Sequence, residues 1–130
     1  MSQSARSILI ADDEPTLLRM MALYLGRLGY SVATASTSAQ AWADEARAPR
    51  EFGVAVLAAT MPGIGLNDLV LKMLAASPGL CILAASGYPV DMSALAAQAP
   101  GRVEFLQKPF TPEMLASAVR RLLGPEKETV

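Results

Sequence analysis

The sequence predicts an α/β fold: a doubly wound, five-stranded parallel sheet in the order 2-1-3-4-5, with five helices. Five short apolar runs, typical of strands, alternate along the chain with five segments of helical character. The third of these runs is apolar throughout, as expected for a strand that helices cover on both faces. A length of 130 residues suits one domain, which we assign to residues 1–130.

The first predicted strand, Ser7–Ala11, is followed by a helix that begins at Pro15. Proline suits the first turn of a helix, where its missing N–H group is not needed. Gly29 ends this helix, and the β-branched residues of Tyr30–Ala35 indicate the second strand. The helix is amphipathic, since its apolar residues recur at helical spacing: Leu17, Leu18, Met21, Leu25 and Leu28.

The middle of the chain continues the alternation. Ser38–Ala48 reads as a helix that ends before Pro49, because the residue preceding a proline disfavours helical backbone. Phe52–Ala58 is the third strand. A helix over 67–76 follows, and the turn residues Ser77-Pro78-Gly79 close it.

The last third completes the sheet. Leu80–Ala85 is the fourth strand, and a short helix over 91–98 leads to the fifth strand, Arg102–Leu106. Thr111 is expected to cap the final helix, which reaches Leu123.

Composition excludes several classes of function. The chain has no histidine, which excludes histidine-based acid–base catalysis and the roles of histidine kinase and histidine phosphotransfer domain. A net charge of −1 without a basic run argues against direct binding of nucleic acid. The single cysteine, Cys81, allows no disulfide within the chain and is expected to be a core thiol. No apolar segment is long enough for a membrane span and residues 1–7 are too polar for a signal peptide, so we expect a soluble, cytoplasmic domain.

Polar residues stand at the ends of several predicted strands. Asp12-Asp13 follow the first strand, Ser86 follows the fourth and Lys108 follows the fifth. Because ligands of this fold bind outside the carboxyl ends of the strands, we expect these residues to converge. Adjacent acids can bind Mg²⁺, while a hydroxyl and an ammonium can hold the oxygens of a phosphoryl group.

Each feature also has a purely structural interpretation. Asp12-Asp13 could cap the first helix, Ser86-Gly87 could be a turn, and Lys108-Pro109 could be an ordinary loop. Their conjunction at corresponding strand ends favours a shared site.

In order and spacing, four motifs resemble the receiver domain of two-component response regulators, over about residues 6–123: Asp12-Asp13, Met61-Pro62-Gly63, Ser86-Gly87 and Lys108-Pro109-Phe110. The resemblance implies a signalling domain that is not an enzyme. Its implied partners are a histidine kinase or phosphotransfer protein and a downstream output protein or domain.

The resemblance also implies a Mg²⁺ site. Asp13 matches the direct metal ligand, Asp12 matches the acid that acts mainly through water, and Thr60 matches the residue whose backbone carbonyl completes the metal shell.

Four further residues match the phosphoryl site and its switch. Ser86 matches the switch hydroxyl, and Lys108 matches the lysine that pairs with the phosphorylated aspartate. Phe105 matches the aromatic residue that moves between exposed and buried states, and Pro109 matches a cis-proline position.

The chain departs from the family at two positions. Ala58 stands three residues before Met61-Pro62, where the family carries its phosphoacceptor aspartate, and Leu66 stands where the family usually has glycine. A methyl group cannot form an acyl phosphate, and losing a carboxylate makes Mg²⁺ binding weak or absent. Two origins fit: a natural pseudo-receiver, or an Asp-to-Ala variant of an active receiver.

The resemblance implies an output or homodimer surface over residues 91–123. Its candidate residues are Met92, Leu95, Arg102, Glu113, Arg120 and Arg121. The alternative function is a Mg²⁺-dependent phosphohydrolase that uses Asp12 or Asp13 as nucleophile. The chain lacks an inserted cap domain and a long substrate loop, which argues against this alternative.

Overall fold

The computed structural model describes residues 7–48 and 51–124 and contains the five predicted strands and five predicted helices. The strands are β1 (Ser7–Ala11), β2 (Ser31–Ala35), β3 (Val54–Ala58), β4 (Cys81–Ser86) and β5 (Val103–Gln107). The helices are α1 (Pro15–Arg27), α2 (Ser38–Arg47), α3 (Leu66–Ala76), α4 (Ser93–Gln98) and α5 (Pro112–Leu123). Predicted and observed bounds differ by one or two residues at most ends. The helix stop expected at Pro49 and the expected domain limits at 1 and 130 lie outside the described residues.

All strand pairs are parallel, and the order in the sheet is β2-β1-β3-β4-β5, which confirms the predicted topology. The register places Ala11 opposite Leu57, Ala58 opposite Ala85, and Ala85 opposite Leu106. The carboxyl ends of the strands therefore form one edge of the sheet.

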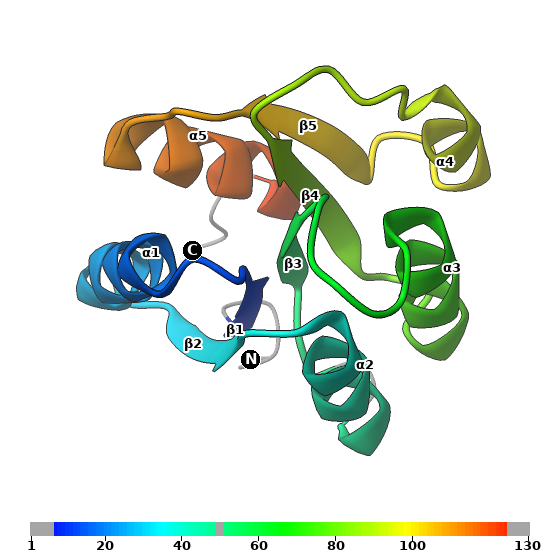
Figure 1. Ribbon diagram of the computed structural model, residues 1–130, viewed down its shortest axis with the longest axis horizontal. Helices are drawn as coiled ribbons and strands as arrows, with labels where there is room; N and C mark the ends of the chain where they lie inside the picture. Colours follow the sequence, from blue (N-terminus) through cyan, green and yellow to red (C-terminus); the bar gives the residue numbers. More distant parts are fainter. Residues whose placement is uncertain (1–6, 49–50, 125–130) are drawn as a thin grey trace.

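Helices cover both faces of the sheet: α1 and α5 lie on one side, and α2, α3 and α4 lie on the other (Figure 1). The central strands β1, β3 and β4 are buried along their whole length. Alternate residues of β1 enter opposite cores, so that Ile8 and Ile10 pack with α1 and α5 while Leu9 and Ala11 pack with α2 and α3. This two-sided burial explains why the central strands read as continuous apolar runs.

Two helix starts follow the rules of capping. The Thr111 hydroxyl oxygen accepts a hydrogen bond from the Met114 amide at 3.1 Å, as predicted for the start of α5. Thr37 does the same for α2 through the Gln40 amide at 3.1 Å, a cap that we did not predict. Among the described residues, no helix is both long and apolar enough to cross a membrane.

Contacts between α2 and α3 include two polar ones. The buried Ser77 hydroxyl, just after α3, donates a hydrogen bond to the buried Glu45 carboxylate of α2. Nearer the start of both helices, the Lys72 ammonium lies over the Trp42 ring, 5.7 Å from its centroid. Together these contacts tie the two helices to each other along their length.

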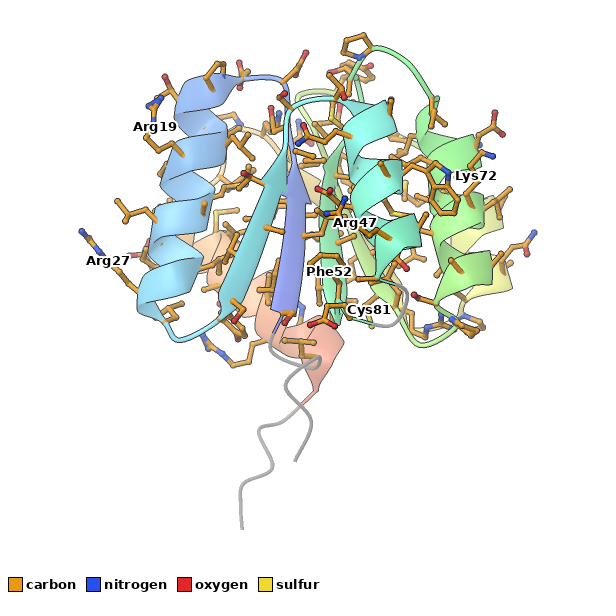
Figure 2. All side chains as sticks on the ribbon, turned by 90° about the horizontal axis from the view of Figure 1, so that it is seen from below. Arg19, Arg27, Arg47, Phe52, Lys72 and Cys81 are labelled. Carbon is orange, nitrogen blue, oxygen red and sulfur yellow. The ribbon has the colours of Figure 1, made fainter. Side chains whose placement is uncertain are left out.

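Cys81 begins β4, at the edge of the sheet opposite the carboxyl ends of the strands (Figure 2). It is buried, and its thiol contacts the Leu122 carbonyl oxygen at 3.4 Å, which confirms that it is a core thiol. Burial raises the pKa of the Cys81 thiol above its ordinary value.

We therefore expect Cys81 to react with a thiol reagent at pH 8 at least about tenfold more slowly in the folded chain than in the unfolded chain. Burial limits both the access of the reagent and the formation of the thiolate. The measurement is the rate of mixed-disulfide formation with and without denaturant. Rapid stoichiometric labelling of the folded chain would show that β4 opens far more readily than its burial indicates.

Candidate signalling site at the carboxyl edge of the sheet

The four expected strand-end residues lie at one edge of the sheet. Asp12 directly follows β1, Ala58 ends β3, Ser86 ends β4 and Lys108 directly follows β5. The Lys108 Nζ atom lies 2.9 Å from Asp12 Oδ2. Because β3 and β4 separate β1 from β5 in the sheet, this ion pair joins the two sides of the edge across the ends of the strands that carry Ala58 and Ser86.

The Asp12 carboxylate is buried, and each of its oxygens has a partner. Its side chain is 1% exposed, and its second oxygen, Oδ1, accepts a hydrogen bond from the Glu14 amide at 2.9 Å. The Asp12 amide in turn donates to the Ala35 carbonyl of β2 at 3.1 Å. Asp12 therefore binds the backbone at the entrance to α1, as the capping interpretation expects, and it also pairs with Lys108.

The arrangement fits a metal ion poorly. Asp13 and Thr60 are exposed, but Asp12 already uses one oxygen for Lys108 and the other for the backbone. Over residues 7–48 and 51–124, no group of three or more histidine, cysteine, aspartate or glutamate side chains is placed to hold a metal. Mg²⁺ needs oxygen ligands in near-octahedral geometry, and of the two predicted acid ligands only Asp13 is free of the Lys108 contact.

The ends of β4 and β5 are joined through the backbone. The Lys108 amide donates to the Ser86 carbonyl at 2.7 Å, and the Gln107 side-chain amide donates to the Gly87 carbonyl at 3.2 Å. The buried Ser86 hydroxyl accepts a hydrogen bond from the Tyr88 amide at 3.2 Å. The structure therefore agrees with the interpretation of Ser86 as a turn residue, because its hydroxyl oxygen bonds the backbone of the loop that follows it.

Two features of β5 and its following loop agree with the resemblance. The Lys108–Pro109 peptide bond is cis. Phe105 is half-buried, between the two extremes expected of the switch aromatic.

Ala58 presents only a methyl group at the end of β3. It is 3% exposed, lies opposite Ala85 of β4, and is followed by a further ladder bond from the Ala59 amide to the Ala85 carbonyl at 2.8 Å. The position carries no nucleophile.

The structure also brings in Ser38, which sequence reasoning missed. Its hydroxyl, at the start of α2, donates to the Pro62 carbonyl at 2.8 Å and accepts from the Ile64 amide at 2.7 Å. A serine at the first position of a helix signals a cap, and nothing in the sequence indicates a bond to a loop 24 residues further on. Leu66, the second departure from the family pattern, begins α3 directly after this loop.

The expected surface over residues 91–123 is only partly available. Leu95 is buried in the core, so its assignment to the surface is wrong; it fills the space between α4 and the sheet. Arg102 donates two hydrogen bonds to the Leu80 carbonyl, at 3.1 and 3.2 Å. Arg121 pairs with Glu104 of β5 at 2.9 Å, and Glu113 and Arg120 are exposed.

Removing the lysine tests the importance of the Asp12–Lys108 pair. We expect Lys108→Met to lower the free energy of unfolding by about 2 kcal/mol, because it leaves a buried carboxylate without its cation. The exposed Arg120→Met, which removes the same charge from α5, should change it by less than about 0.5 kcal/mol. Urea unfolding measures both values.

The double variant Asp12→Asn/Lys108→Met provides the decisive comparison. It should be less destabilised than the sum of the two single variants, since the unpaired charge is gone. Strict additivity would show that the two side chains do not interact in solution.

Comparison with known proteins agrees with this geometry. Residues 8–120 match the family described as the response regulator receiver domain. The chain is 29% identical over 126 residues to the DNA-binding transcriptional regulator NtrC of Bradyrhizobium, covering 97% of this chain and 26% of that protein. It is 31% identical over 119 residues to the transcriptional regulatory protein FixJ of Azorhizobium caulinodans, covering 92% of this chain and 56% of that protein. The chain thus spans between about a quarter and about half of the length of these relatives.

Solved structures show the same fold. A response regulator receiver domain protein from Clostridium thermocellum superposes with a TM-score of 0.78 at 26% identity, over 90% of this chain and 93% of that one. A response regulator receiver protein from Sinorhizobium medicae gives a TM-score of 0.76 at 25% identity, over 94% and 97%. With the family match covering most of its length, the chain belongs to the response regulator receiver domain family.

Proposed function

We propose that this chain is a receiver-type signalling and protein-interaction domain of a two-component phosphorelay that is not phosphorylated at the usual site. One observation carries the proposal: Ala58 ends β3 at the edge where Asp12 and Lys108 meet. Phosphoryl transfer to a receiver requires an aspartate carboxylate as nucleophile, and an alanine methyl group cannot take that part.

In the ion pair, Asp12 takes the place of the missing carboxylate as the partner of Lys108. Lys108 in turn takes the place of a metal as the cation beside Asp12. A buried Asp12 needs a positive charge or hydrogen-bond donors nearby, and Lys108 and the Glu14 amide supply them. The edge is therefore electrostatically satisfied by protein groups alone. This arrangement supports a domain that rests in one conformational state and in which Mg²⁺ binds weakly or not at all.

The phosphohydrolase alternative is not favoured by the geometry. A nucleophilic aspartate must reach the phosphorus atom, but both Asp12 oxygens are engaged and the side chain is buried. Asp13 is exposed, and over the described residues no group of three or more histidine, cysteine, aspartate or glutamate side chains is placed to hold a metal with it. We propose a signalling role in the cytoplasm and no enzymatic activity.

The proposed partners are those of a receiver: a histidine kinase or phosphotransfer protein, and a downstream output protein or domain. NtrC is named as a DNA-binding transcriptional regulator, and FixJ as a transcriptional regulatory protein, so an output in transcription fits these relatives. We propose residues 91–123 as the surface for output or for a homodimer, with Glu113 and Arg120 exposed on it. The receiver domain itself is not proposed to bind nucleic acid.

Both origins of Ala58 remain compatible with this function. In a natural pseudo-receiver, the ion pair would be the permanent state of the site. In an Asp-to-Ala variant, it would form because the competing carboxylate has been removed. Restoring the aspartate distinguishes the two.

We expect acetyl phosphate with Mg²⁺ to leave the mass of the intact protein unchanged, because position 58 carries no carboxylate. Intact-protein mass spectrometry measures this, with an aspartate-bearing receiver as positive control. An acid-stable, base-labile gain of one phosphoryl group per chain would overturn the proposal and direct attention to another acid.

Mg²⁺ alone should cause changes only at roughly millimolar concentration, confined to the amide signals of Asp13 and Thr60 in NMR spectra. Asp13→Asn should abolish them, because Asp13 is the carboxylate at this edge that is not already bonded to Lys108. Saturation at micromolar Mg²⁺ would show that a competent metal site survives.

Ala58→Asp should restore phosphorylation by acetyl phosphate if the chain is a variant of an active receiver. A third carboxylate beside Asp12 and Asp13 should cost on the order of 1 kcal/mol of stability without metal, and Mg²⁺ should recover that loss. Ala58→Asn is the matched control, because the asparagine side chain has nearly the same shape as that of aspartate but carries no charge and no nucleophile.

The decisive measurements are thermal unfolding with and without Mg²⁺ and the protein mass after treatment with acetyl phosphate. A folded, Mg²⁺-binding Ala58→Asp protein that still gains no phosphate would contradict the engineered origin. The loop at Gly65-Leu66 would then be the first place to examine.

A further inference from the structure

We propose that Ser38 is a positioning residue for the signalling edge: its hydroxyl fixes the path of the β3–α3 loop, and with it the backbone of Thr60. This inference goes beyond the proposed function and does not depend on residue 58, on phosphate or on a metal. It rests on the two hydrogen bonds of one buried side chain.

Ser38 contacts the loop from both sides of a glycine. Its side chain is 0% exposed, and its hydroxyl donates to the Pro62 carbonyl oxygen and accepts from the Ile64 amide, at 2.8 and 2.7 Å. One hydroxyl thus satisfies an acceptor and a donor two residues apart, on the flanks of Gly63. Because the serine that makes both bonds is itself buried, these bonds anchor the turn to the start of α2.

Gly63 is matched to this serine by shape and by conformation. Its φ is +103°, in the region that favours glycine, and a Cβ atom built on it would lie 2.6 Å from Ser38 Oγ. The next nearest contact of that atom would be Ser38 Cβ at 4.0 Å, an ordinary van der Waals distance. The hydroxyl therefore occupies the space that a side chain at position 63 would need.

The helix that carries Ser38 is held independently of the loop. The Thr37 hydroxyl oxygen accepts from the Gln40 amide, the Thr37 carbonyl accepts from the Ala41 amide, and the Gln40 side chain accepts from the Ser36 amide. Further along, α2 is tied to α3 by the Glu45–Ser77 and Trp42–Lys72 contacts. Through its two hydrogen bonds, Ser38 therefore links the loop to a helix that other contacts hold in place.

Thr60 lies between two fixed neighbours in this loop. Before it, the Ala59 amide continues the ladder to β4 by bonding the Ala85 carbonyl at 2.8 Å. After it, Met61 is buried in the core cluster that also contains Ala58, and the next residue is Pro62, bonded to Ser38. The backbone of Thr60, although exposed, is thus held by β4 on one side and by α2 on the other. Movements of α2 should reach the signalling edge through this connection.

Hydrogen exchange of single amides tests the role of Ser38. In Ser38→Ala, the Ile64 amide should exchange at least about tenfold faster, while the Gln40 amide keeps its exchange rate. The amide signals of Thr60 and Met61 should shift in the same NMR spectra, although the hydrogen bonds of the serine hydroxyl go to Pro62 and Ile64. Ser36→Ala, which removes an exposed hydroxyl just before α2, should change none of these signals.

A mutant cycle with Gly63 gives a second, independent test. Gly63→Ala alone should be strongly destabilising, because it adds steric conflict with the hydroxyl to an unfavourable φ. In the Ser38→Ala background the steric conflict with the hydroxyl disappears. Gly63→Ala should then lower the free energy of unfolding clearly less than it does in the unaltered chain.

Three results would overturn the proposal. Unchanged Ile64 exchange in Ser38→Ala, or equal acceleration at Ile64 and Gln40, would show that the hydroxyl does not position the loop. Additive effects of Ser38→Ala and Gly63→Ala on stability would contradict the packing that matches the two residues. Both experiments use the chain with Ala58 in place, so their failure is distinguishable from a failure of the phosphorylation experiments.

Discussion

The carboxyl edge of the sheet, where Asp12, Ala58, Ser86 and Lys108 lie, depends on one ion pair, between the carboxylate of Asp12 and the ammonium of Lys108. The two residues lie 96 positions apart in the chain and follow the first and the last strand. Their contact depends on the pairing of four strands, because β3 and β4 lie between β1 and β5. The carboxylate is almost completely buried and the lysine side chain is 19% exposed, so solvent screens the pair only weakly.

The rest of the edge is arranged around this pair by backbone hydrogen bonds. Asp12 connects to β2 through Ala35 and to α1 through Glu14, while Lys108 connects to β4 through Ser86. The methyl groups of Ala58 and Ala85 lie at the strand ends between them. Protein groups thus satisfy the charges at this edge, whereas an aspartate at position 58 would add a negative charge that competes with Asp12 for Lys108. Ala58 therefore leaves this edge without a nucleophile and adds no charge that competes with the pair.

Much of the fold could be predicted from sequence because its signals are local. The alternation of apolar runs with helical segments gives the elements, and turn residues such as Gly29 and Pro15 mark where they begin and end. The convergence of Asp12, Ser86 and Lys108 follows from the rule that parallel strands end at one edge. Once Asp12 and Lys108 converge, their opposite charges attract strongly in this buried place, which favours the observed ion pair.

What the sequence did not reveal depends on side-chain geometry across elements. Leu95 reads as an exposed helical position, yet it is buried, because it lies on the face of α4 that packs into the core cluster with α3 and the sheet. The bonds from Ser38 to the β3–α3 loop and from Ser77 to Glu45 join residues 24 to 32 positions apart through hydroxyl groups. Serine carries no long-range signal of its own, since its hydroxyl is equally suited to caps and turns.

The most direct measurement of the central claim is the NMR signal of the Lys108 ammonium group, recorded with and without Mg²⁺. We expect a slowly exchanging ammonium signal that persists in excess Mg²⁺ and is lost in Asp12→Asn, because the lysine remains bonded to Asp12 whether or not the metal is present. Loss of the signal on addition of Mg²⁺ to the unaltered chain would show that the metal displaces the lysine. The ion pair would then not be the resting state of this receiver.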